Sequence, residues 1–336
     1  MKVLSARECG IIVLLWLLAG SGGSTCGSLL PPLVKTIPLT GVEGRIDHLA
    51  LDALGKRLFI AAIGNNSVEV VDLDKGQQIH SITGLNEPQG IVFNSNTQEI
   101  AVASGDGTCK FYGARTYELL RTIQLAADAD NLRLDVSANR IYAGCGDGMI
   151  SALNATNGGR IAGGDLPLPE HPEAFEIELA GTRIFANLPD HGSVAVLDRQ
   201  KQVALAAWSL DSARANFPMA LDETDHRLFV GCRHPARLVI LNTDQGKVVT
   251  ALPCVGDADD VFFDETLQRV FVSGGEGFID VFHMPDADHY VPDGTITTAP
   301  GARTSLLSPE LHQLYAAVPH RGEQPAEIRV YDLLAK

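Results

Sequence analysis

The chain contains an internal repeat of 41 to 44 residues, in which one position is acidic in four of seven copies and the next position is polar in four of them. Carboxylates held close together repel one another, and a bound cation, proton uptake or a paired arginine relieves that repulsion. Oxygen donors of this kind favour calcium or magnesium over zinc. The recurring residues are Asp47, His48, Gln89, Asp130, Asn131, Glu173, Asp259, Asp260 and Arg303.

This set of residues fits three kinds of site. It can be a site for a divalent cation (calcium or magnesium), a site for a small organic ligand that uses the whole set, or a polar lining that only water fills. In the first case four carboxylates would be the metal ligands, namely Asp47, Asp130, Glu173 and Asp259.

Hydrolysis is one reaction that such a cation supports. A divalent metal polarises a carbonyl and activates water, with His48 or Asp260 as the base and Arg303 as the partner of the oxyanion. The chain contains no HExxH, GxSxG or phosphate-loop motif, and no CxxC or CxxCH spacing. Ligand binding without catalysis is therefore the leading hypothesis, and a metal-dependent hydrolase is its alternative.

These residues can meet only if the repeat closes the chain into a ring. Three apolar residues follow each repeat anchor, the middle one is aromatic in six of seven copies, and a turn-forming residue usually lies five positions before the anchor. Short apolar runs bounded by Gly, Asn and Asp turns are typical of antiparallel strands. A period near 42 residues predicts one four-stranded blade per copy, and hence a seven-bladed β-propeller. The seven anchors are Arg57, Glu99, Arg140, Arg183, Arg227, Arg269 and Gln313.

The last blade lacks a strand of its own. The seventh copy stops after its third strand, at residues 328–332, whereas residues 33–41 resemble the fourth strand of an earlier copy. Propellers avoid unpaired sheet edges between first and last blades, so we expect the N-terminal strand to complete blade seven. The sequence thus predicts one all-β domain over residues 33–336, with four antiparallel strands in every blade.

The N-terminus has the pattern of a secretory signal. Lys2 and Arg7 precede an apolar run at residues 11–19 and a tract of small residues at 20–24. That run is too short for a permanent membrane anchor, so we expect a cleaved signal peptide over residues 1–25 and a linker over 26–32. Cys26 raises the alternative of a lipid anchor, but the leucine expected three positions earlier is missing. These features predict a periplasmic or secreted protein.

The composition restricts the partners. The formal net charge is −15, which disfavours binding to the phosphates of nucleic acid. No stretch after residue 30 is long and apolar enough for membrane insertion. A small molecule or a protein remains as the expected partner.

The first copies also carry a family resemblance. DHLALD at 47–52, RLFIAA at 57–62 and SVEVVD at 67–72 are similar to the YVTN-type repeat of YncE-like seven-bladed β-propellers, and the similarity extends over residues 33–336. The resemblance implies a family that includes binding proteins, lactonases and subunits with redox cofactors, but the metal-binding clusters of the redox members are missing here. It favours an extracytoplasmic binding or scaffold protein that uses the channel mouth or the blade loops, with a lactonase-like hydrolase as the alternative.

Overall fold

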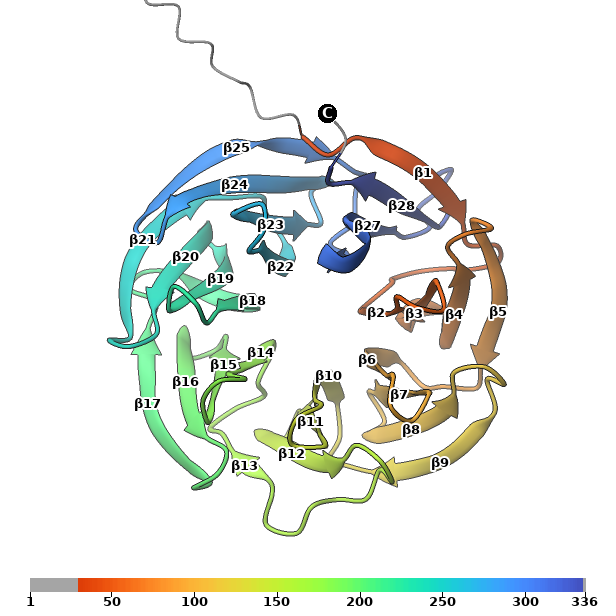
Figure 1. The fold of residues 1–336 in the computed structure, drawn as a ribbon, viewed down its shortest axis with the longest axis horizontal. Helices are drawn as coiled ribbons and strands as arrows, with labels where there is room; N and C mark the ends of the chain where they lie inside the picture. The colour runs from red at the N-terminus through yellow and green to blue at the C-terminus, as the bar shows by residue number, and fades with distance from the viewer. Residues whose placement is uncertain (1–29, 335–336) are drawn as a thin grey trace, which may run out of the picture.

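Seven antiparallel sheets of four strands each form a ring in the computed structural model, which describes residues 30–334 (Figure 1). This arrangement confirms the predicted all-β, seven-bladed β-propeller. Within residues 30–334, no helix is long and apolar enough to cross a membrane. The predicted signal peptide and Cys26 lie outside the described residues.

The first four blades follow one another along the chain. Blade 1 contains β2 (Leu49–Asp52), β3 (Arg57–Ala62), β4 (Ser67–Asp72) and β5 (Gln77–Thr83). Blade 2 contains β6 (Pro88–Asn94), β7 (Glu99–Ser104), β8 (Thr108–Gly113) and β9 (Leu119–Gln124). Blade 3 contains β10 (Ala129–Asp135), β11 (Arg140–Cys145), β12 (Met149–Asn154) and the short β13 (Leu166–Pro167). Blade 4 contains β14 (Phe175–Ile177), β15 (Arg183–Leu188), β16 (Ser193–Asp198) and β17 (Val203–Ser209).

The last three blades complete the ring. Blade 5 contains β18 (Arg214–Asp222), β19 (Arg227–His234), β20 (Ala236–Asn242) and β21 (Lys247–Pro253). Blade 6 contains β22 (Ala258–Asp264), β23 (Arg269–Gly274), β24 (Phe278–Asp286) and β25 (His289–Thr297). Blade 7 contains β26 (Thr304–Ser308), β27 (Gln313–Val318), β28 (Glu327–Asp332) and the N-terminal β1 (Leu33–Pro38).

A carboxylate closes the first hairpin of several blades. Asp52 accepts a hydrogen bond from a turn N–H at 2.8 Å and forms an ion pair with Arg57 at 2.6 Å. Asp135, Asp222 and Asp264 accept turn N–H groups in the same way, at 2.9, 3.1 and 3.0 Å. Because a hairpin turn fixes strand register, these residues set which side chains of each first strand face the ring axis.

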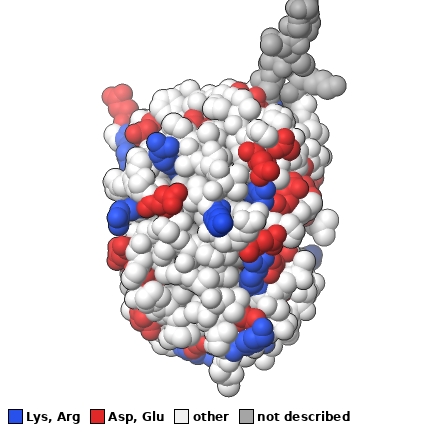
Figure 2. All heavy atoms as spheres, turned by 90° about the vertical axis from the view of Figure 1, so that its left-hand side faces the viewer, with Lys and Arg blue, Asp and Glu red and all other residues white. Residues whose placement is uncertain are grey.

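The outermost strands form the rim of the ring and are largely exposed. In β17, for example, Val203 and Leu205 are 46% and 50% exposed. Figure 2 views the rim from the left of Figure 1, and there basic and acidic side chains are interspersed among uncharged ones. This face therefore offers no large patch of a single charge.

The aromatic residue that six of the seven repeats share packs between neighbouring blades. Phe59 of blade 1 is fully buried and lies in one cluster with Ile91 and Val102 of blade 2. Phe229 of blade 5 is equally buried, in a cluster with Val261 of blade 6. Burial of these side chains holds adjacent blades together, which explains why an aromatic residue recurs at this position of the repeat.

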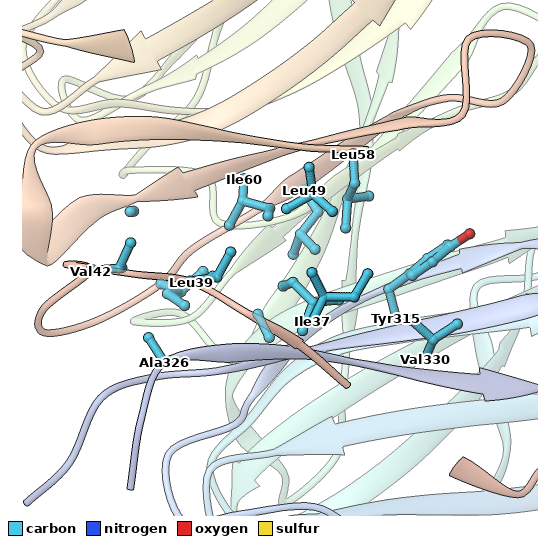
Figure 3. Packing of buried hydrophobic residues seen from close by; sticks show 14 of the residues in the cluster. Ile37, Leu39, Val42, Leu49, Leu58, Ile60, Tyr315, Ala326 and Val330 are labelled. Atoms are coloured by element: carbon cyan, nitrogen blue, oxygen red, sulfur yellow. The ribbon is translucent and has the colours of Figure 1, made fainter. Parts of the chain in front are cut away.

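The N-terminal strand closes the ring as expected. β1 pairs antiparallel with β28, so that Ile37 lies opposite Ile328. Figure 3 shows Ile37 packed between Leu58 of blade 1 and Tyr315 and Val330 of blade 7. β1 therefore completes the sheet of blade 7, and a buried apolar cluster joins blade 7 to blade 1.

Candidate functional site

A β-bulge opens the first strands of the blades at the ring axis. In blade 1, Asp47 N donates to Ala61 O at 2.7 Å and Ala61 N donates to His48 O at 3.0 Å, so two residues share one partner. Glu173 and the residue after it share Asn187 in the same way, and the register shifts at the same place in β6, β10, β18 and β22. Regular strands alternate their side chains between faces, but a bulge re-aims one of them. Two adjacent repeat positions therefore both border the axis.

A cavity of about 240 Å³ lies where these strands begin, and we call it the mouth cavity. The structure brings every residue of the predicted set to its wall. These residues are Asp47, His48, Gln89, Asp130, Asn131, Glu173, Asp259, Asp260 and Arg303.

Six further charged or titratable residues line the mouth cavity, and the sequence analysis did not select them. Three lie twelve positions before an anchor, two lie seven before an anchor, and the last lies six after one. Five of the six can be found from these repeat positions once the bulge is known. The six are Arg45, Asp128, His171, Arg133, Glu176 and Arg233.

Two arginines neutralise one side of the mouth cavity. Arg233 forms a short ion pair with Asp259, and Arg303 Nε lies 3.2 Å from the other oxygen of the same carboxylate. Arg303 also contacts Asp257 at 3.0 Å, while the Arg233 guanidinium lies over the Phe217 ring at 3.7 Å. Burial raises the pKa of Asp259 to about 6 even though both arginines oppose the shift. This side is a compact network whose charges are already paired.

His48 lies in the wall of the mouth cavity, between three carboxylates. Its Nε2 is 3.8 Å from Asp47 and 3.9 Å from Asp130, and its Nδ1 is 3.8 Å from Asp260. Burial lowers the pKa of His48, so the imidazole adds no positive charge beside these carboxylates near pH 7. Arg45 supplies the positive charge for Asp47, at 2.8 Å.

Two carboxylates are left without a cation. Asp130 is only 9% exposed, and its buried Oδ1 has no hydrogen-bond partner. Neither Asp130 nor Glu173 forms an ion pair with a lysine or arginine in the part of the chain that the structure describes. Burial, reinforced by the charge of Asp47, raises the pKa of Asp130 well above its ordinary value. Burial and the charge of Asp259 raise the pKa of Glu173 to about 7.

The four predicted metal ligands do not share one coordination shell. Among residues 30–334, no group of three or more His, Cys, Asp or Glu side chains is arranged to hold a metal ion. Asp47 and Asp259 are turned toward arginines, so only Asp130 and Glu173 of that set remain free for a cation. Asp47, Asp130, Glu173 and Asp259 therefore do not form one shared metal site within the described residues.

Beyond the mouth cavity, the wall of the channel along the ring axis is more apolar. Arg133 of blade 3 and Glu176 of blade 4 form an ion pair at 3.3 Å that borders both halves of the channel. The second half is a cavity of about 340 Å³ whose wall includes Val92, Phe262 and Leu306. Polar recognition groups are thus concentrated at one end of the axis.

Comparison with known proteins shows similarity of fold. No protein-family model matches the sequence, and no curated protein matches it. A chain of the mitotic checkpoint complex has a TM-score of 0.77 at 12% identity and covers 99% of this chain and 98% of its own. The WD40 repeats of RRP9 have a TM-score of 0.78 at 12% identity, covering 90% and 98%. A chain of Kuenenia stuttgartiensis hydrazine synthase has a TM-score of 0.73 at 14% identity, covering 83% and 95%. The chain is therefore a β-propeller with WD40-like structural neighbours.

Proposed function

We propose that this protein is an extracytoplasmic, YncE-like binding propeller that holds a small molecule in the mouth cavity. One observation carries the proposal: Asp130 lines the cavity, and its buried Oδ1 has no hydrogen-bond partner. Buried polar atoms in folded proteins are nearly always hydrogen-bonded, because an unpaired one costs about 1–3 kcal/mol. A bound ligand would supply the missing partner.

The size and lining of the mouth cavity favour a small polar ligand. Its volume of about 240 Å³ lies just below the range of typical ligand pockets, which begins at roughly 300 Å³. Seven carboxylates and four guanidinium groups supply hydrogen bonds on nearly every side. Binding would therefore depend on polar contacts, with Phe217 as one of few apolar surfaces.

The extracytoplasmic location rests on the N-terminal sequence. Basic residues, an apolar run and a tract of small residues follow one another within residues 1–25, in the order of a secretory signal. Cell fractionation of the expressed full chain tests this part of the proposal. We expect a shortened protein outside the cytoplasm, whereas a full-length protein in the cytoplasm would contradict it.

A thermal-shift screen with polar small molecules tests the binding function. We expect at least one compound to raise the melting temperature of the wild type, since a ligand that binds only the folded state stabilises it. Gln89→Trp fills the wall of the mouth cavity and should abolish the shift. Gln200→Trp changes an exposed residue outside the cavity wall and should retain it. Shifts of equal size in both variants would place the ligand elsewhere, and no shift with any compound would remove the proposed function.

A further inference from the structure

The wall of the mouth cavity carries more carboxyl groups than guanidinium groups. It carries seven carboxyl groups against four guanidinium groups, and His48 adds no positive charge near neutral pH. The arginines are also engaged, because Arg45 pairs with Asp47, Arg133 pairs with Glu176, and Arg233 and Arg303 both pair with Asp259. An anionic ligand would have to break one of these pairs, whereas a cationic ligand would not.

Two of these carboxyl groups have no lysine or arginine partner among the described residues. Asp130 and Glu173 come from neighbouring blades, line the same cavity and interact electrostatically with each other. Asp130 gives an independent indication of a ligand. This residue is only 9% exposed, and its Oδ1 has no hydrogen-bond partner. A donor that also carries positive charge would satisfy that oxygen and relieve the repulsion at once.

The donor set favours an organic cation over a metal ion. Calcium requires six to eight oxygen ligands, and magnesium requires six in a regular octahedron. The described side chains form no group of three that can hold a metal ion. A protonated amine needs only two or three acceptors around its nitrogen, which Asp130, Glu173 and a backbone carbonyl or water can provide.

We propose that the ligand of the mouth cavity is a small organic cation whose protonated amine binds between Asp130 and Glu173. This inference rests on the proposed binding function and specifies its ligand class. The remaining wall, with Gln89 and Asn131, would hydrogen-bond the polar parts of the same molecule.

Titration calorimetry with three four-carbon probes tests the ligand class. Putrescine carries an amine at each end, butanediol replaces both amines with hydroxyl groups, and succinate replaces them with carboxylates. We expect putrescine to bind one site, and we expect no measurable heat from butanediol or succinate. Calcium is titrated separately as the inorganic cation.

Matched variants locate the bound amine. Asp130→Asn keeps the side-chain shape and removes the charge, so we expect at least a tenfold loss of putrescine affinity. Glu173→Gln should weaken binding in the same direction, which gives a second variant if the first fails to fold. Asp74→Asn removes an exposed carboxylate that does not line the mouth cavity and should bind like the wild type.

Each contrary outcome identifies what has failed. If succinate or butanediol binds and Gln89→Trp abolishes that binding, the proposed function stands and the cation inference falls. If calcium binds with a dependence on Asp130, the ligand is a metal ion and the inference is also overturned. Equal putrescine affinity in Asp130→Asn and wild type would show nonspecific attraction to an acidic protein. If no probe and no compound of the thermal-shift screen binds, both proposals fail together.

Discussion

Glu173→Gln should stabilise the ligand-free protein at alkaline pH. The ordinary pKa of 4.5 is raised to about 7 in the folded protein, first by burial and then by the charge of Asp259, while Arg233 opposes the shift. The charges of Asp128 and Asp47 add to the rise. An acid whose pKa is raised on folding binds more protons in the folded state, so the wild type loses stability as pH rises from 4.5 through about 7. That interval corresponds to about 3 kcal/mol, since one pKa unit is worth about 1.4 kcal/mol.

Urea unfolding at several pH values measures this effect. The free energy of unfolding of Glu173→Gln minus that of the wild type should increase by up to about 3 kcal/mol between about pH 4.5 and about pH 8. Taking the difference between two pH values cancels any pH-independent effect of the substitution. Glu323→Gln changes an exposed glutamate and should show almost no such dependence. A difference that stays constant with pH, or that falls as pH rises, would refute the electrostatic account of the mouth cavity.

Three further predictions concern the ring itself. Phe59→Ala and Phe229→Ala should each lower the free energy of unfolding by about 3–5 kcal/mol, the usual loss on emptying a buried aromatic site, and unchanged denaturant midpoints would contradict the packing between blades. Deletion of residues 33–41 should lower the melting temperature of the whole propeller, because β28 loses its partner and becomes an exposed edge; an unchanged melting temperature would contradict closure by β1. Gly90→Ala should destabilise the protein and weaken ligand binding, because its Cβ would meet the carbonyl oxygen of Asp130 at 1.9 Å; wild-type stability and affinity would show that the two blades can separate there.

The sequence predicted the fold because every blade repeats the same local chemistry. Turn formers such as Asp52 and Asp264 close hairpins, and buried aromatics such as Phe59 fill the space between blades, so their spacing marks each strand. Closure by residues 33–41 followed from counting strands and finding one missing in the last blade. Repetition made these features visible, since a single blade would not have distinguished them from an ordinary meander.

The candidate site could be predicted only in part. The repeat positions that carry Asp47 and His48 stood out by their residue types, but an alternating strand would turn one of the two away from the axis. The bulge that turns both inward depends on backbone geometry that residue types do not specify. The ion pairs could not be predicted either, because Arg233 lies on the second strand of its blade and meets Asp259 of the next blade only in the folded structure. For this reason a cation site stayed one of three alternatives at the sequence level, whereas the structure pairs two of the four candidate ligands, Asp47 and Asp259, with arginines.

A crystal structure of the protein with putrescine would show whether the amine binds between Asp130 and Glu173. We expect one ammonium nitrogen about 2.7–3.2 Å from an oxygen of the Asp130 carboxylate, with a Glu173 oxygen as a second acceptor and with the Arg233–Asp259 and Arg45–Asp47 pairs intact. Putrescine bound only on the rim, or within the mouth cavity but away from Asp130, would contradict the account.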